Sequence, residues 1–305
     1  MPIIVNQINS PLNATEQEVI STALKKLGSA SKHTIECEIH KSSLDARKRN
    51  DIHFVHSVFV TLDNADLEKK LCEKNTSLTY VERSVYKPVI STEKAMGRVV
   101  IAGFGPAGMF AGLALAEQGY RPIILERGGS MEKRTASVKK FWHTGELDTN
   151  CNVQFGEGGA GTFSDGKLTT RIKDPLCRYV LERFVDFGAP KEILTKAKPH
   201  IGTDNLRNIV TAIRKRIIEL GGEVRFDTAL TDMAIANGRV LTISADDKDE
   251  KVSAVILAIG HSARDTFELL QRKNIFIEPK PFSVGARIEH KQTAVDESLY
   301  GEQAG

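Results

Sequence analysis

Residues 98–126 read RVVIAGFGPAGMFAGLALAEQGYRPIILE. The β-branched run at 99–101 is typical of a strand buried on both faces, and Gly103, Gly105 and Gly108 follow it in GxGxxG spacing. The first glycine permits a tight turn, the second lets a phosphate approach the bare backbone, and the third lets the next helix pack closely on the strand. The N-terminus of that helix offers free N–H groups and a partial positive charge. These features predict a βαβ unit that binds a dinucleotide.

The residues after the motif complete the unit. A helix is expected from about Ala107 to Gln118, Gly119 stands where a helix C-terminal glycine belongs, and a second apolar strand is expected at 122–125. That strand ends in Glu126, whose carboxylate can accept hydrogen bonds from both ribose hydroxyls and would repel a 2′-phosphate. The sequence therefore favours FAD or NAD over NADP. The alternative, a glycine-rich turn followed by an ordinary exposed glutamate, is the weaker interpretation because the full unit is present.

The composition is that of an ordinary globular protein and indicates no particular class of partner. The chain has 305 residues, of which 41% are hydrophobic and 27% charged, enough for two globular domains. Its net charge of +3 is too balanced to indicate nucleic acid or lipid headgroups. We expect a cytoplasmic protein without a membrane span, because the first residues lack a signal-peptide pattern and no apolar run is long enough to cross a bilayer. The four cysteines form no CxxC pair, which disfavours disulfides and a zinc site.

The first 92 residues have their own pattern. An apolar segment at 3–8 precedes a helix opened by Thr15 and Glu18 as a capping box; two β-rich runs, a short helix and a further strand follow. The order βαββαβ predicts a ferredoxin-like α+β domain over residues 1–92. Its central strands are joined by the basic connection SLDARKRN at 43–50. This connection could contact phosphate or nucleic acid, or dock on the second domain, but a solvated loop is favoured over RNA because no aromatic residues accompany the charges.

The second domain is expected over residues 97–280, after a polar linker at 91–97. Regular periodicity lapses after the βαβ unit and returns in helices at about 175–188 and 205–220, followed by three strands. The Asn237-Gly238 pair predicts a hairpin turn. The last strand, 252–259, runs into Gly260, where it could rejoin a parallel sheet. Residues 281–305 are predicted to begin a third unit, with a strand at 282–288.

A second glycine-rich segment at 152–168 reads NVQFGEGGAGTFSDGKL. With so few Cβ atoms, its backbone N–H groups can approach a flat or anionic ligand, and Lys167 adds a cation. A flexible linker is a poor alternative, because Phe155, Phe163 and Leu168 are predicted to anchor the segment in a core. We therefore expect Gly158, Gly159, Ala160 and Gly161 to contact a cofactor.

Three motifs together resemble a family of bacterial FAD-dependent dehydrogenases: GFGPAG with LERG at 125–128, FGEGGAGTFSDGKL at 155–168, and AIGHSARD at 258–265. The SLDAR segment at 43–47 is similar to the domain that precedes the flavin domain in that family, so the resemblance covers nearly the whole chain. It implies an α/β protein with a Rossmann-like FAD-binding domain behind a ferredoxin-like one, of the type with two dinucleotide-binding domains. The expected activity is oxidoreduction of a small-molecule substrate through non-covalent FAD, with NAD(P)H as a candidate electron donor.

The resemblance also assigns residues. Gly260 matches a strand-end glycine of such flavoproteins, although isoleucine precedes it where they carry threonine. Lys167 and His261 are weak catalytic candidates, for charge on the reduced flavin and for proton movement. The remaining implied contacts are the pyrophosphate at Gly103, Gly105, Pro106, Ala107 and Gly108, the ribose at Glu126, phosphate at Arg127 and Arg134, and adenine near Leu230.

Such flavoproteins return to the nucleotide domain near their C-terminus, and no matching segment follows Gly260. The resemblance therefore implies that the chain is truncated. Three other functions stay open from the sequence: an RNA-directed flavoprotein, a non-catalytic dinucleotide sensor, and a dehydrogenase that uses NAD alone.

Overall fold

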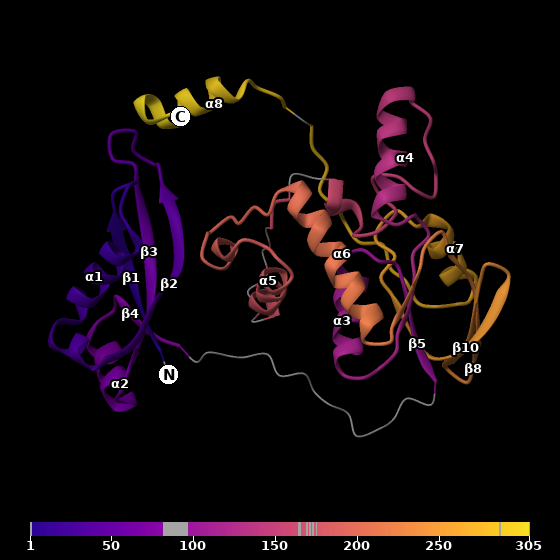
Figure 1. Ribbon diagram of the computed structural model, residues 1–305, viewed down its shortest axis with the longest axis horizontal. Helices are drawn as coiled ribbons and strands as arrows, with labels where there is room; N and C mark the ends of the chain where they lie inside the picture. Colours follow the sequence, from indigo (N-terminus) through magenta and orange to yellow (C-terminus); the bar gives the residue numbers. More distant parts are fainter. Residues whose placement is uncertain are drawn as a thin grey trace.

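The computed structural model describes residues 2–81, 97–163, 166–168, 170, 172, 174, 176–286 and 288–304. These residues form two sheets (Figure 1). Each sheet is packed against its own hydrophobic clusters. The predicted linker and the domain boundary near residue 92 fall outside the described residues. The boundaries at 92, 97 and 280 thus stay predictions.

The N-terminal sheet is antiparallel, in the order β2-β3-β1-β4. This order, with a crossover helix after the first and third strands, is the ferredoxin-like topology expected from the sequence. Alternate residues such as Ile3 and Val58 point to the helices and form the core. The elements are β1 (Ile3–Ser10), α1 (Glu16–Leu27), β2 (Thr34–Asp45), β3 (His53–Leu62), α2 (Ala65–Lys74) and β4 (Leu78–Tyr80).

The predicted capping box opens α1. The Thr15 side chain accepts from the Glu18 N–H at 3.3 Å, and the Glu18 carboxylate accepts from the Thr15 N–H at 2.8 Å. Thr15→Ala leaves the Glu18 N–H without its side-chain partner, and we expect the free energy of unfolding to fall by about 1 kcal/mol. Urea unfolding measures this, with Thr22→Ala in the same helix as the control expected within about 0.5 kcal/mol of wild type. Equal losses for both variants would contradict the prediction.

The second sheet has six strands in the order β7-β6-β5-β10-β9-β8. The first four are parallel, and β10 also pairs antiparallel with β9 through its first residues. Asn237 and Gly238 form the predicted hairpin turn with φ of 51° and 71°. The strands are β5 (Arg98–Ala102), β6 (Ile123–Leu125), β7 (Glu223–Arg225), β8 (Leu230–Ala236), β9 (Arg239–Ala245) and β10 (Lys248–Leu257).

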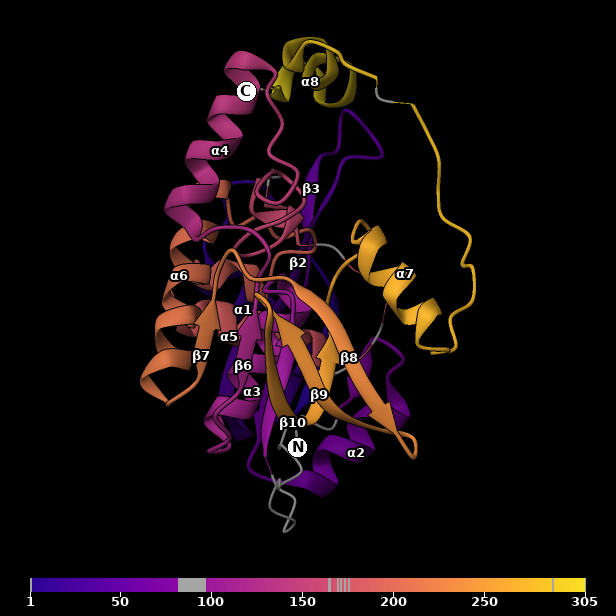
Figure 2. The same cartoon turned by 90° about the vertical axis from the view of Figure 1, so that its right-hand side faces the viewer.

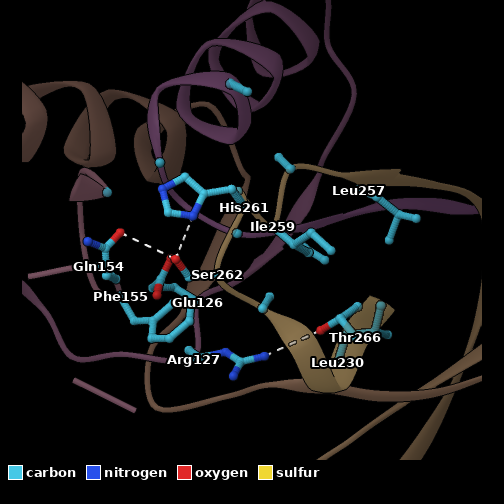
Figure 3. A pocket seen from close by; sticks show the side chains of 18 of the residues that line it. Glu126, Arg127, Gln154, Phe155, Leu230, Leu257, Ile259, His261, Ser262 and Thr266 are labelled. Carbon is cyan, nitrogen blue, oxygen red and sulfur yellow. Dashed lines mark hydrogen bonds between the residues drawn. The ribbon is translucent and has the colours of Figure 1, made fainter. Parts of the chain in front are cut away.

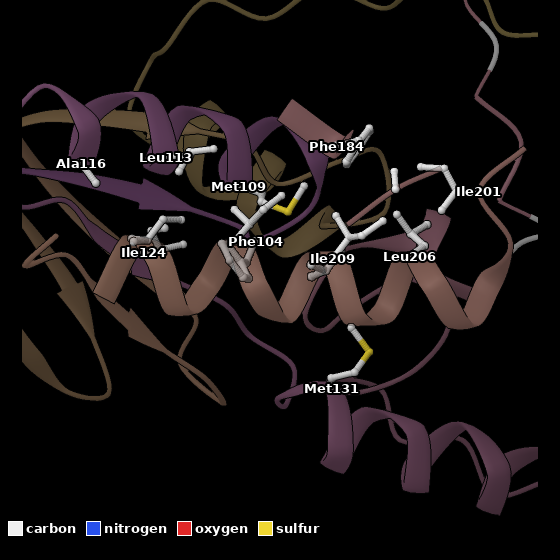
Figure 4. Packing of buried hydrophobic residues seen from close by; sticks show 14 of the residues in the cluster. Phe104, Met109, Leu113, Ala116, Ile124, Met131, Phe184, Ile201, Leu206 and Ile209 are labelled. Carbon is white, nitrogen blue, oxygen red and sulfur yellow. The ribbon is translucent and has the colours of Figure 1, made fainter. Parts of the chain in front are cut away.

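Helices cover both sides of the parallel strands (Figure 2). On one face, Ile101 and Ile124 pack against α3 (Pro106–Glu117) and α6 (Thr203–Glu219) in the cluster of Figure 4. On the other face, strand residues such as Val100 and Leu125 pack against the β8–β9 hairpin and α7 (Arg264–Arg272). The alternation of the strand residues thus builds a three-layer α/β fold with a Rossmann-type βαβ unit at its centre.

Several elements of this region differ from the sequence prediction. Helix α4 (Met131–Thr144) was not predicted, because only Met131, Arg134 and Val138 of it are buried and no apolar stripe marks it. The strand expected at 282–288 is wrong: the described residues there form no ladder. A strand needs a neighbour to pair with, and Phe282 and Val284 are 84% and 85% exposed. Helices α5 (Leu176–Asp186) and α8 (Gln292–Tyr300) complete the described chain.

The edge of β2 bonds the segment 195–197, which precedes α6. The Ser42 N–H donates to the Thr195 carbonyl at 2.7 Å, and the Ala197 N–H donates to the Ser42 carbonyl at 2.9 Å. Across the described ranges, no helix combines the length and the apolar character needed to cross a membrane.

Candidate functional site

A cavity of about 690 Å³ lies at the carboxyl ends of the parallel strands (Figure 3). Ala102, Leu125 and Leu257, the last residues of β5, β6 and β10, line it, and so does the start of α3. In open α/β sheets this edge is where ligands bind. The cavity residues that the sequence had marked are Gly103, Gly105, Pro106, Ala107, Glu126, Arg127, Gly159, Ala160, Gly161, Leu230, Gly260 and His261.

The first turn of α3 faces this cavity with unsatisfied backbone donors. Its N-cap, Gly105, has no side chain to cap the helix, and Pro106 occupies the first helical position. The first N–H groups of a helix have no carbonyl one turn earlier to bond, which here concerns Ala107 and Gly108. The Ala107 N–H therefore borders the cavity at the positive end of the helix dipole, with the Gly108 N–H one residue further along the turn, an environment suited to an anion.

The three glycines of the GxGxxG motif differ in what a Cβ at each position would meet. A Cβ on Gly103 would lie 2.4 Å from the Ala258 carbonyl oxygen, and Gly103 has a φ of 103°. A Cβ on Gly108 would lie 1.9 Å from the Gly103 carbonyl oxygen. A Cβ on Gly105 would meet only the Gly159 Cα, at an ordinary 3.7 Å. The fold itself thus requires Gly103 and Gly108, whereas the free protein has room for a methyl group at Gly105.

Glu126 is the carboxylate of the cavity, and it is 5% exposed. Its Oε2 accepts from the Phe104 N–H at 2.7 Å, and its Oε1 accepts from Gly128 and Gly156 at 2.9 and 2.8 Å. A carboxylate oxygen accepts about two hydrogen bonds. Oε1 is therefore saturated and Oε2 has one position left. The sequence predicted contacts to both ribose hydroxyls, but this geometry leaves room for one at full strength.

Arg127 follows Glu126 at the cavity wall. Its guanidinium donates to the Asp265 carboxylate at 2.8 Å and to the Thr266 hydroxyl at 3.3 Å, and it lies 4.6 Å from the centre of the Phe155 ring. These contacts join the end of β6 to the start of α7. Arg127 therefore lines the cavity, but its positive charge is already paired with the Asp265 carboxylate. Its expected contact with a phosphate stays a prediction.

The second wall is the glycine-rich segment. Gly159 approaches Gly105 so closely that a Cβ on it would lie 2.8 Å from the Gly105 Cα. Phe155 lines the cavity, and it is not among the residues of the three hydrophobic clusters of the described chain. Gln154 and Ser262 also line the cavity, and the Ser262 hydroxyl bonds His261 Nδ1 at 2.7 Å and Gln154 Oε1 at 3.5 Å.

Four sequence-predicted residues lie outside the cavity lining. Arg134 is fully buried and bonds backbone carbonyls, so the structure gives it no phosphate contact. Gly158 is buried and donates to the Phe104 carbonyl, and Gly108 packs against the turn. Lys167 is exposed, its backbone forms an isolated β-bridge with His200, and it is not part of the cavity lining.

The sequence missed Gln154, Ser262, Thr266 and Phe267, which line the cavity. Gln154 lies in the glycine-rich segment 152–168, directly before the motif at 155–168, and Ser262 lies inside the AIGHSARD motif, so both stand in or beside a recognised motif. Thr266 and Phe267 belong to α7, a helix that was not predicted, and no local pattern indicated them.

The other chemical groups raised by the sequence have local partners. Arg47 pairs with Asp45 at 2.6 Å, and Arg49 donates to the Ser298 carbonyl, so two cations of the basic connection are engaged within the chain. The Cys151 thiol is buried and accepts from the Gly129 N–H. Within the ranges that the structure covers, no group of three His, Cys, Asp or Glu side chains is placed to hold a metal ion.

Residues 1–61 match a domain of unknown function, DUF8436. An uncharacterized protein of Clostridium beijerinckii is 43% identical over 302 residues, which are 99% of this chain and 56% of that protein. The chain thus spans about half the length of this relative.

Similar solved structures include THI4 of Thermovibrio ammonificans, with a TM-score of 0.38, 22% identity and coverage of 58% of this chain and 62% of that one. Glycine oxidase of Bacillus cereus has a TM-score of 0.38, 14% identity and coverage of 59% and 58%.

Proposed function

We propose that this chain binds a dinucleotide at the cavity, with FAD as the ligand, and that it belongs to an FAD-dependent oxidoreductase. The observation that carries the proposal is the juxtaposition of an uncapped helix N-terminus and a buried carboxylate on one cavity. A diphosphate needs the first and a ribose hydroxyl needs the second.

The residues present fit such a ligand. The Ala107 and Gly108 N–H groups would hold the pyrophosphate above the bare Gly105 Cα, and Glu126 Oε2 would accept from a ribose hydroxyl. Leu230 and Phe267 give apolar surface on the cavity wall for the adenine. A 2′-phosphate next to Glu126 would bring two negative charges together, so FAD and NAD are favoured over NADP.

Bound flavin supplies the redox chemistry by accepting and passing on a hydride equivalent. The chain binds the cofactor, orients it and excludes water. His261 and Ser262 are the hydrogen-bonded pair on the cavity wall that could hold or move a proton. We do not assign that role to Lys167, which lies outside the cavity. Because the chain spans only about half the length of its relative, the proposal names no substrate and no electron acceptor for it.

Titration with FAD, NAD and NADP tests the proposal. We expect saturable binding of FAD with a change in its visible spectrum and fluorescence, and much weaker binding of NADP. Folded protein that binds neither FAD nor NAD would refute the proposed function. Binding of NAD with no uptake of FAD would favour the NAD-only dehydrogenase, and stable FAD binding by the full-length protein without electron transfer to any acceptor would favour the sensor.

A further inference from the structure

Arg134, in the first turn of α4, donates hydrogen bonds to the backbone carbonyl oxygens of the loop at residues 152–157. Its Nε donates to Asn152 at 3.0 Å, its Nη2 to Val153 at 3.0 Å, and its Nη1 to Glu157 at 2.6 Å and Gly156 at 3.4 Å. All four acceptors belong to the glycine-rich segment. A planar guanidinium is suited to this task because its donors point in fixed, divergent directions.

Burying this cation is costly, so its position needs an explanation. The Arg134 side chain has no exposed surface, and burial lowers its pKa to about 10 despite nearby Glu126 and Glu157. It therefore stays charged at neutral pH. An apolar side chain of similar volume would fill the space without this penalty. The gain from the arginine is the fixed geometry of the loop that it binds.

Glu157 makes the reciprocal connection. Its Oε2 accepts from the Met131 N–H at the start of α4 at 2.6 Å, and its Oε1 lies 3.2 Å from Arg214 Nε on α6. Burial raises the pKa of Glu157, and Arg214 opposes this rise. Glu157 of the loop thus binds the N-terminal end of α4, while Arg134 of α4 binds the carbonyls of the loop.

The loop backbone is shaped around Arg134. Gly156 has a φ of 120°, and a Cβ there would lie 2.4 Å from Arg134 Cδ. Gln154 and Phe155, which lie between the bonded carbonyls, project into the cavity, and Gly159 follows opposite Gly105. The carbonyls face the guanidinium while these neighbours face the ligand space.

We propose that Arg134 is a positioning residue for dinucleotide binding: it holds residues 152–157 so that Gln154, Phe155 and Gly159 form one wall of the cavity. The inference rests on the proposed function, but it assigns Arg134 no contact with the ligand. Disorder in this wall would have to be removed on binding, which weakens affinity.

The experiment compares FAD binding by wild type, Arg134→Ala and Arg134→Lys. We expect both variants to lose affinity by roughly 10- to 100-fold. A lysine cannot replace the guanidinium, because its three donors do not reach four divergent carbonyls. Millimolar guanidinium should restore a part of the affinity of Arg134→Ala, whereas equal urea, which is neutral, should not. A role in folding alone would not give this rescue.

Arg207→Ala is the matched control. Its guanidinium lies 4.6 Å from the Phe163 ring that Arg134 also approaches, yet it makes none of the four carbonyl bonds. We expect its FAD affinity to stay within about two-fold of wild type. Hydrogen exchange of residues 152–161 without ligand should increase in Arg134→Lys and not in Arg207→Ala, which covers the case in which Arg134→Ala does not fold.

Wild-type affinity in folded Arg134→Ala or Arg134→Lys would overturn the inference while the proposed function survived. Equal rescue by urea would overturn it too. Wild-type protein that binds no dinucleotide would instead refute the proposed function, whatever the exchange data showed about the loop.

Discussion

Gly105→Ala is expected to lower FAD affinity on the order of 100-fold while the protein stays folded. The added methyl meets only the Gly159 Cα at 3.7 Å in the free protein, and the Gly105 φ of −76° and ψ of −175° suit alanine. In the complex the same methyl would occupy the space where a pyrophosphate reaches the N–H groups of α3. Overpacking of this kind costs about 1–3 kcal/mol, and the upper end corresponds to roughly 100-fold in affinity.

Gly105 is a sharper probe of the cavity than Glu126. Replacing Glu126 by glutamine would place an NH₂ donor against at least one of the three backbone N–H groups that the carboxylate now accepts, so stability and binding would change together. For Gly105→Ala, isothermal titration gives the affinity and thermal unfolding of the ligand-free protein gives the control. Unchanged FAD affinity in the folded variant would place the diphosphate somewhere else.

The sequence predicted the βαβ unit and the ferredoxin-like order because these depend on local signals. Strand alternation, glycine spacing, the Thr15 capping box and the Asn237-Gly238 turn are each encoded within a few neighbouring residues. The start of β10 was placed four residues late, at 252 instead of 248. The preceding turn uses Asp246 and Asp247 at φ of 49° and 57°, a pair that is a weaker hairpin signal than Asn-Gly.

The errors at the site concern contacts between distant residues. Arg134 and Lys167 are cations near glycine-rich motifs, and residue type alone favoured phosphate or flavin contacts for both. Which way a side chain turns from a loop depends on what packs behind it. The Arg134 side chain turns to the backbone carbonyls of residues 152–157, about twenty residues away in the sequence. The backbone of Lys167 forms a β-bridge with His200, away from the cavity lining. Phe155 was missed as a cavity residue because its partner, Arg127, belongs to another strand end.

Gly108→Ala should destabilise the fold, which is the opposite of what helix propensity alone predicts. Gly108 lies in the first turn of α3, and alanine there would be favoured by up to about 1 kcal/mol if only backbone entropy mattered. The new Cβ would however lie 1.9 Å from the Gly103 carbonyl oxygen and 3.0 Å from its carbon. Backbone atoms of a tight turn cannot move aside as a flexible side chain can.

We therefore expect Gly108→Ala to lose about 3 kcal/mol or more of unfolding free energy, because relieving the clash must separate α3 from β5. Gly105→Ala is the matched control, since it is the same substitution three residues earlier with no clash; its stability should stay within about 1 kcal/mol of wild type, because alanine is only a poorer N-cap than glycine. Urea unfolding followed by circular dichroism measures both. Equal or greater stability in Gly108→Ala would mean that helix and strand are farther apart than the structure places them, and the turn would then lack the close approach on which the anion site depends.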